Sequence, residues 1–143
     1  RATMKQRAED MAAARASASG GFQQFPETGT YYAELIRVAD GVKNSEYWAR
    51  PIFRVVSGPN GSDEYENQEF AGDGGNTGKR TVGLWILAQG LTGGQAPDDA
   101  EDLQECYQGC VGNVYQLNVV DSDEGYRNVR IQQQVDSVPA AGD

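Results

Sequence analysis

The stretch that most constrains the fold runs from residue 29 to residue 58 and reads GTYYAELIRVADGVKNSEYWARPIFRVVSG. Apolar residues occupy every second position from Tyr31 to Leu35, which is the pattern of a half-buried β-strand. The apolar phase then slips, because Ile36 and Val38 fall on the other parity. A slip inside a strand predicts a β-bulge or a strongly coiled strand, such as small barrels use to turn a corner.

The second half of this stretch predicts another strand, joined to the first by a polar loop that contains glycine. Phe53 and Val55 share one face of this strand, while Ile52, Arg54 and Val56 share the other. An arginine in the middle of an apolar strand, preceded by aromatic residues, predicts an outer face that meets a flat, anionic ligand.

The composition fits one domain built mainly from strands. A chain of 143 residues can form a hydrophobic core, and 18 glycines with only 38% apolar residues favour strands and turns over a helical bundle. No apolar run is long enough to cross a bilayer and no signal peptide is visible, which predicts a cytoplasmic protein without a membrane partner.

Charge and residue types narrow the possible functions. The net charge of −9 argues against binding duplex DNA by general electrostatics, although it leaves room for a local basic groove. The absence of histidine removes the commonest general base and the commonest metal ligand. We therefore expect a protein that is not an enzyme, with no catalytic residues, no cofactor and no bound metal.

The N-terminal residues 1–21 predict a helical arm. Residues 2–18 are rich in alanine, and a pair of glycines ends the segment. Its only large apolar residues are Met4 and Met11, so the apolar stripe is thin and the arm is expected to be exposed. A helix with so little to bury is ordered by another molecule if at all, and we expect a homo-oligomer through this helix.

Beyond the long strands, the pattern predicts a turn at 57–63, a third strand at 64–71, a loop at 72–78 and helices at 79–91 and 98–107. The residues expected to be buried on the two helices are Val82, Trp85, Ile86, Leu91, Leu103 and Tyr107.

Two more strands are predicted at 111–121 and 126–135, with a turn at 121–125 between them and a frayed tail at 136–143. The residues expected in the core from these strands are Val114, Leu117, Val119, Tyr126, Val129 and Ile131, and the first of the two strands is expected to change phase.

The predicted order is therefore three strands, two helices and two strands. Five strands with a helical insertion between strands 3 and 4 is the connectivity of the OB-fold, a partly open Greek-key barrel that binds oligonucleotides across strands 2 and 3. We predict an OB-fold domain over residues 22–135, between the helical arm at 1–21 and the flexible tail at 136–143.

A family resemblance rests on the spacing of glycine and β-forming residues. The residues that carry it are Pro26, Gly29 and Tyr31 before and in the first strand, Val55 and Gly58 at the end of the second, and Gly112 and Val119 at the fourth. With this spacing, residues 25–135 resemble a family of short phage and prophage single-stranded DNA-binding proteins of the OB type. The resemblance implies a role in phage DNA replication and recombination, in the host cytoplasm if the chain is phage-encoded. That family has a lysine-rich loop between strands 1 and 2. This chain has a single lysine there, Lys43, which we expect to contact DNA.

Candidate binding residues lie on or beside the second and third strands. Tyr47, Trp48, Arg50 and Arg54 combine aromatic rings that stack on bases with arginines that meet phosphate, as sequence-tolerant binding of single strands requires. Tyr65 on the third strand joins this group. The alternative for Tyr47 and Trp48 is that they pack the mouth of the barrel, whereas arginine is rarely fully buried.

Three other signals are interpreted as structural. GGNTGK at 74–79 lacks the first glycine and the final serine or threonine of a phosphate loop. DSDEG at 121–125 lacks the further ligands of a calcium loop and is interpreted as a hairpin turn. Arg127 and Arg130 on the last strand are interpreted as solvated charges, with contact to the binding groove as the alternative.

Cys106 and Cys110 lie four residues apart on a predicted helix. They share a face but are too far apart for an unstrained disulfide within the helix, and two thiols without histidine do not complete a zinc site in one chain. We expect both to be reduced and replaceable by Ala or Ser with DNA binding intact.

The sequence thus predicts a non-enzymatic protein that coats single-stranded DNA with little sequence preference, with replication or recombination proteins as possible further partners. The alternative is a virion or assembly protein in which the barrel docks other proteins. The acidic composition favours the alternative, and the arginines and aromatic residues of the second strand favour DNA binding.

Overall fold

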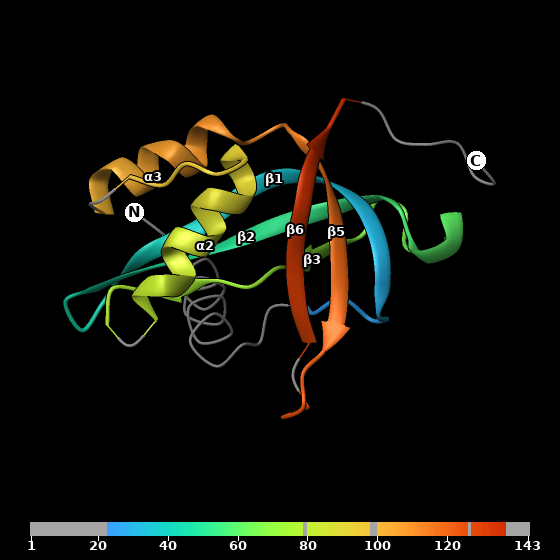
Figure 1. Cartoon of the computed structure of the whole chain (residues 1–143), viewed down its shortest axis with the longest axis horizontal. Coiled ribbons are helices and arrows are strands. Elements are labelled where there is room, and N and C mark those ends of the chain that lie inside the picture. The colour runs from blue at the N-terminus through green and yellow to red at the C-terminus, as the bar shows by residue number, and fades with distance from the viewer. Residues whose placement is uncertain (1–22, 79, 98–99, 126, 137–143) are drawn as a thin grey trace, which may run out of the picture.

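Figure 1 shows a computed structural model of the chain, which describes residues 23–78, 80–97, 100–125 and 127–136. The predicted N-terminal helix and the tail beyond residue 136 lie outside the described residues, as does Tyr126.

The described part is mainly β, as predicted. Its elements in chain order are β1 (Gly29–Lys43), β2 (Glu46–Ser57), the 3-10 turn η1 (Pro59–Gly61), β3 (Glu69–Ala71), β4 (Gly75–Asn76), α2 (Thr81–Thr92), α3 (Ala100–Gly109), β5 (Val114–Asp121) and β6 (Arg127–Val135). The six strands form one antiparallel sheet in the order β3-β2-β1-β5-β6, with β4 also paired to β2.

The long β1–β2 hairpin contains the predicted irregularity. The pairing steps from Leu35↔Phe53 to Arg37↔Ile52 and leaves Ile36 without an opposite residue, which is a β-bulge. Leu35 and Val38 are therefore both buried although they differ in parity. The bulge predicted from the apolar phase is confirmed.

The turn of this hairpin consists of two polar residues. Asn44 and Ser45, with φ of 53° and 67°, form a two-residue connection in the left-handed region, which is the geometry that matches the twist of the flanking strands. Gly41 lies within β1 opposite Trp48 and not in the connecting loop. The connection is polar, as predicted, but the prediction that it contains glycine is wrong.

The third strand is much shorter than predicted. Turn hydrogen bonds run from Glu66 N to Asp63 O and from Gln68 N to Tyr65 O, and Asn67 has a φ of 67°. Residues 64–67 therefore form turns, and the regular pairing with β2 covers only the three residues of β3. Asn67 and Gln68 add two backbone hydrogen bonds with Val55 of β2. A strand of this length does not reach β6, so the sheet is not closed into the predicted barrel.

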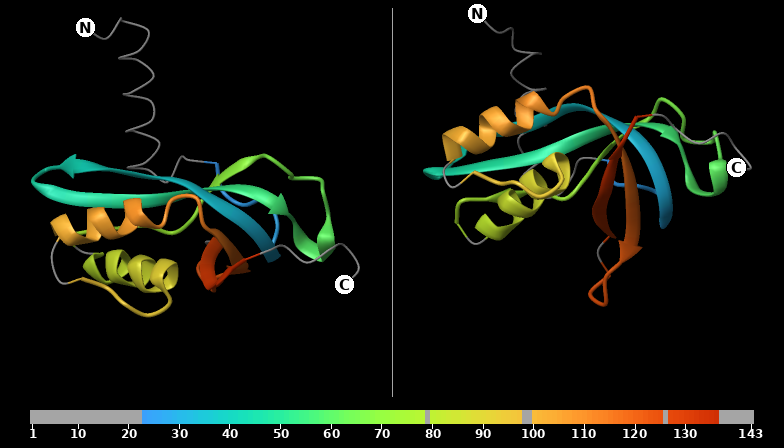
Figure 2. Two further views of the ribbon diagram at one scale, coloured as in Figure 1. Left: turned by 90° about the horizontal axis from the view of Figure 1, so that it is seen from above. Right: turned by 45° about the horizontal axis from the view of Figure 1, so that its top comes forward.

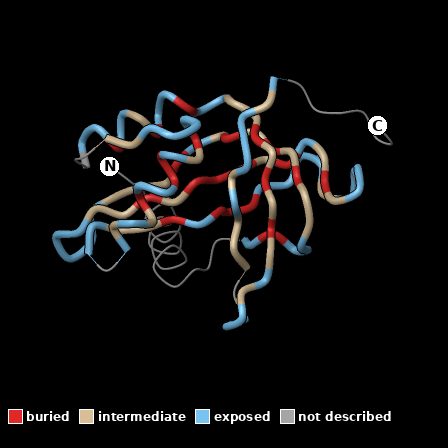
Figure 3. Tube along the Cα trace, in the orientation of Figure 1, coloured by how far each residue is buried: buried red, intermediate tan, exposed pale blue. Residues whose placement is uncertain are grey.

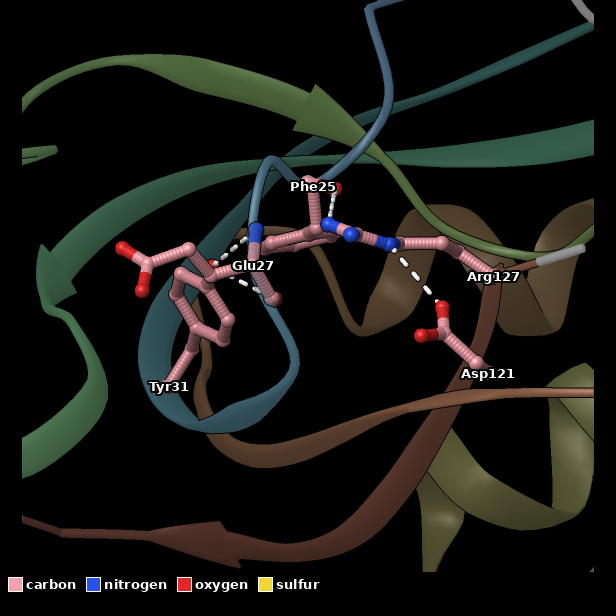
Figure 4. A network of polar contacts seen from close by, with 5 residues as sticks. All are labelled: Phe25, Glu27, Tyr31, Asp121 and Arg127. Carbon is pink, nitrogen blue, oxygen red and sulfur yellow. Dashed lines mark hydrogen bonds and ion pairs between the residues drawn. The ribbon is translucent and has the colours of Figure 1, made fainter.

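A short segment before β1 bridges part of the gap between β3 and β6. Gln24 forms a parallel bridge with Ala71 of β3, and Arg127 of β6 donates from Nη1 to the carbonyl of Phe25 at 2.9 Å. Arg127 also donates from Nε to Asp121 Oδ1 at 3.1 Å, as Figure 4 shows. Arg127 is therefore half-buried and structural, and its interpretation as a solvated charge is wrong.

Helix α2 forms where predicted but presents a different face to the core. Its buried residues are Leu84, Leu87, Ala88 and Leu91. Val82, Trp85 and Ile86 are 61%, 37% and 60% exposed, so their prediction as core residues is wrong.

Close backbone packing explains which side of α2 faces inward. A Cβ on Gly83 would lie 2.8 Å from the carbonyl oxygen of Gly74, and one on Gly90 would lie 3.0 Å from the Ile131 side chain. Only glycine permits this approach, so the face that carries both glycines packs against the sheet.

Helix α3 and strand β5 complete the core. Leu103 and Tyr107 are buried as predicted, and the Tyr107 hydroxyl donates to the Leu84 carbonyl at 2.7 Å. In β5, Leu117 and Val119 are buried as predicted.

The third core residue of β5 differs from the prediction. Tyr115 is buried and Val114 is only half-buried, so β5 alternates without the expected phase change. The Tyr115 hydroxyl donates to the Leu91 carbonyl at 2.8 Å and ties the end of α2 to the sheet. A tyrosine can enter the core at this point because its hydroxyl has a partner there.

The two described helices lie on one face of the β1–β2 hairpin and not on the other. Figure 2 shows α2 and α3 on the same side of this hairpin, and Figure 3 shows the buried residues along the strands and the inward side of the helices. Neither described helix covers the opposite face of the hairpin.

Candidate nucleic-acid interface

We call the side of β1 and β2 that points away from α2 and α3 the outer face. Because Ala49, Phe53 and Val55 point into the core, the alternation of β2 directs Trp48, Arg50 and Arg54 to the outer face. The paired positions of this face, from the hairpin turn onward, are Lys43 with Glu46, Gly41 with Trp48, Ala39 with Arg50, Arg37 with Ile52, and Glu34 with Arg54.

The outer face is locally cationic on an acidic protein. It carries four basic and two acidic side chains on β1 and β2, whereas the whole chain has a net charge of −9. Excess positive charge on one face is what an anionic chain requires for initial attraction.

Trp48 lies across the position of a missing side chain. A Cβ on Gly41 would be 3.2 Å from the indole Nε1 and 3.4 Å from Cε2 and Cζ2. The ring therefore rests along the sheet surface and is half-buried. This contact stabilises the hairpin, and it also leaves a flat aromatic surface on the outer face.

Arg50 lies one step further along the outer face and is partly desolvated. Burial lowers the pKa of its guanidinium, nearby Arg80 lowers it further, and the carboxylate of Asp73 acts in the opposite direction. Among the described residues, no carboxylate forms an ion pair with this guanidinium. It remains a cation at any physiological pH because arginine is so basic.

Arg37 is a candidate that sequence reasoning missed. It is exposed on β1 opposite Ile52, one rung from Arg50 and on the same face. By simple alternation Arg37 would share the buried side of Leu35, but the bulge at Ile36 turns it outward. The phase slip signals a bulge next to Arg37, but it does not say which residue is the extra one.

Arg54 is on the outer face but is neutralised. Its Nη2 lies 3.2 Å from Glu34 Oε1, and Glu69 of β3 is its neighbour on the other side. An arginine between two carboxylates attracts a phosphate less strongly than Arg37 or Arg50 does.

Lys43 stands at the hairpin tip. It is exposed and paired in register with Glu46, whose carboxylate packs against Gly78. Lys43 extends the cationic face by one rung, with an acidic neighbour.

The two candidate tyrosines lie elsewhere. Tyr47 points to the inner side, packs against the core and donates to Asp40 Oδ2 at 2.9 Å, and burial followed by this bond raises its pKa. Tyr65 donates to Glu27 Oε2 at 2.6 Å, and this bond raises its pKa to about 12. Its ring lies 6.1 Å from that of Phe70 in an edge arrangement. The structure does not bring either tyrosine together with the arginines.

The cysteines occupy the end of α3 and the turn after it. Both are free, and Cys110 is buried with its Sγ 3.7 Å from the Leu91 carbonyl. Burial raises the pKa of Cys106, which disfavours the reactive thiolate. Within the described ranges, no group of three His, Cys, Asp or Glu side chains is placed to hold a metal ion.

No protein-family model matches the sequence, and no curated protein is similar to it. The resemblance to phage single-stranded DNA-binding proteins therefore stays a prediction. Among the helices of the described residues, none has both the length and the apolar character needed to cross a lipid bilayer.

Proposed function

We propose that this protein binds single-stranded DNA with little sequence preference through the outer face of β1 and β2. The observation that carries the proposal is the row formed by Trp48, Arg50 and Arg37 on adjacent rungs of one face. A half-buried aromatic ring on the outer face, beside two guanidinium groups that form no ion pair with described residues, provides stacking for bases and charge for phosphates without a hydrogen-bonding pattern that reads sequence.

The aromatic ring of the row favours a single strand over a duplex. In a duplex, neighbouring bases of one strand are stacked with a rise of ~3.4 Å, so their faces are not available to an indole. A base can stack on Trp48 only when it has left this stack, as in an unstacked single strand.

We further propose that the strands form an open OB-type arrangement. The order β3-β2-β1-β5-β6, with the helices inserted before β5, supports this proposal because it is the OB order without the last backbone pairing. We also propose a non-enzymatic role in phage DNA replication or recombination in the cytoplasm. In addition, we propose that the protein forms homo-oligomers through residues 1–21.

A salt titration of binding to fluorescein-labelled oligo-dT tests the proposal. For the double variant Arg37→Ala, Arg50→Ala we expect weaker binding and a slope of log K against log salt that is smaller by about 1.4, because each phosphate contact to a single strand contributes about 0.7. The matched control is Arg54→Ala, which removes an already paired arginine from the same face and should change the slope little. An unchanged slope in the folded double variant would remove the outer face from the site.

A second candidate function is protein docking in a virion or assembly. It is favoured by the exposed apolar residues Val82, Trp85 and Ile86 on α2. If the protein serves only this function, wild type and both variants will bind oligo-dT equally weakly at every salt concentration.

A further inference from the structure

A cavity of about 330 Å³ lies where the sheet fails to close. Its walls are α2 on one side, β6 on another, and the turn after β3 together with β2 at its base. Pro51, Phe53, Leu87 and Ile131 provide apolar lining, and Ile86 stands exposed at its edge. A volume of this size accepts one or two amino-acid side chains, at the lower end of what binding pockets provide.

The cavity runs along a free strand edge. β6 is the last strand of the sheet, and its Val129 N–H donates to Asp73 Oδ2 at 3.1 Å, a side chain that stands where a neighbouring strand would lie. Because backbone groups alternate along a strand, the N–H and C=O of Ile131 point to the same edge as those of Val129. In the described ranges no strand pairs with this edge.

The charged residues that line the cavity carry a small positive excess. Arg80 and Arg130 are exposed basic residues of the lining, and Asp73 is its one acidic residue, so the formal charge of the lining is +1. On a chain with a net charge of −9, this concentration of cations favours an acidic ligand.

We propose that the cavity is a docking site for an extended, acidic peptide segment of a partner protein, which adds as a strand to β6. The segment pairs with the free backbone groups of Ile131, inserts an apolar side chain between α2 and β6, and places a carboxylate near Arg80 and Arg130. A helix facing a free strand edge across an apolar pocket is the arrangement that supports peptide binding by strand addition. The apolar part of this site lies on the inner side of β2, although Arg80 and Asp73 of its lining are also electrostatic neighbours of Arg50. The experiments below therefore change α2 or the peptide and leave the outer face intact.

The probe is a fluorescein-labelled peptide of seven residues that alternates threonine and valine and ends in two aspartates, titrated by anisotropy and by amide NMR shifts. We expect shifts at Ile131 and Leu87. N-methylation at one set of alternate peptide positions should weaken binding about tenfold or more, while the other set should have little effect, since strand addition uses every second N–H. A peptide with lysines in place of the aspartates should bind weakly.

Ile86→Ser tests the pocket, with Val82→Ser as the matched control. Both residues are about equally exposed on α2, so both variants should fold, but only Ile86 lines the cavity. We expect weaker peptide binding for Ile86→Ser alone.

Several results would overturn the proposal. These are the absence of shifts at about 1 mM peptide, N-methyl effects without a period of two, or equal loss in the two serine variants. Oligo-dT that shifts Ile131 and Leu87 while the peptide does not would assign the cavity to nucleic acid. Pairing of β6 with a second copy, seen as a concentration-dependent mass that the peptide leaves unchanged, would assign the edge to self-association.

Discussion

The inner and outer faces of the β1–β2 hairpin share one backbone, but their side chains differ in how far they are buried. On the inner face Leu35, Phe53 and Val55 have no exposed surface and belong to the hydrophobic core. On the outer face Arg37 is exposed and Trp48 and Arg50 are half-buried. Burial in the core explains why the inner residues are apolar. The stability of the fold does not explain why arginines lie beside the Trp48 indole on the outer face.

Two residues depart from this division, and one of them is Val42, which is on the inner face opposite Tyr47 but is 72% exposed at the hairpin tip. Ile52 is on the outer face but only 3% exposed, between Arg37 of β1 and Ala71 of β3. The outer face therefore has an apolar base among its arginines. The two faces therefore differ in the groups at the ends of their side chains and in how far those groups are exposed.

The largest effect is expected on the inner face. Phe53→Ala removes a fully buried ring that packs against Tyr115 in an edge arrangement with centroids 6.4 Å apart. We expect a loss of about 3–5 kcal/mol in the free energy of unfolding, measured by urea denaturation, because a cavity replaces the ring. Arg54→Ala on the outer face should change it by no more than about 1 kcal/mol, since it breaks an exposed ion pair. Similar losses in the two variants would contradict the division between the faces.

A smaller effect is expected where α2 covers the inner face. Gly83→Ala adds a Cβ that would lie 2.8 Å from the Gly74 carbonyl, a backbone atom that moves only if the turn shifts. Alanine favours a helix by about 1 kcal/mol over glycine, and forced overpacking costs about 1–3 kcal/mol. We expect net destabilisation of up to about 2 kcal/mol by thermal or urea unfolding. Stabilisation would show that α2 is not held close by its glycines.

A modest effect is expected at the contact beneath Trp48. Gly41→Ala places a Cβ 3.2 Å from the indole Nε1 and should shift the ring by a few tenths of an ångström. Stability should change by less than about 1 kcal/mol, because alanine lowers the entropic cost of glycine in a strand. Oligo-dT affinity should fall about two- to threefold if ring placement matters. Unchanged affinity would mean that the indole does not contact the strand.

The smallest effect concerns Tyr65, which was a predicted binding residue. Its bond to Glu27 raises the pKa to about 12, above the ordinary value of 10. The bond therefore adds stability that is complete below pH 10 and declines as the pH rises from 10 to 12. The difference in unfolding free energy between wild type and Tyr65→Phe should shrink over that range. Oligo-dT binding at pH 7 should be unaffected, and a loss there would return Tyr65 to the site.

The local pattern of the strands predicted much of the fold. The alternation and phase slip in β1 identified the bulge and the buried residues around it, because a half-buried strand records its two faces in the sequence. It did not reveal Arg37, since the consequence of a bulge for the next residue depends on which residue is the extra one.

The wrong predictions concern features of the fold that the local sequence pattern does not determine. α2 is apolar on most sides, so periodicity could not choose between the face with Leu84 and the face with Ile86, and glycine packing against another backbone made the choice. The third strand was overestimated because residues 64–67 fold into turns that include a positive φ at Asn67. Its length in turn determined that the sheet stays open.

The central claim is that bases stack on the outer face, and tryptophan fluorescence tests it most directly. The chain has two tryptophans, Trp48 on the outer face and Trp85 on α2. Trp85→Phe leaves only Trp48, and Trp48→Phe leaves only Trp85 as a matched control. We predict that saturating oligo-dT quenches the Trp85→Phe protein strongly and the Trp48→Phe protein hardly at all, because stacking on a base quenches an indole in contact with it. Quenching of Trp85 alone, or of neither, would contradict the account.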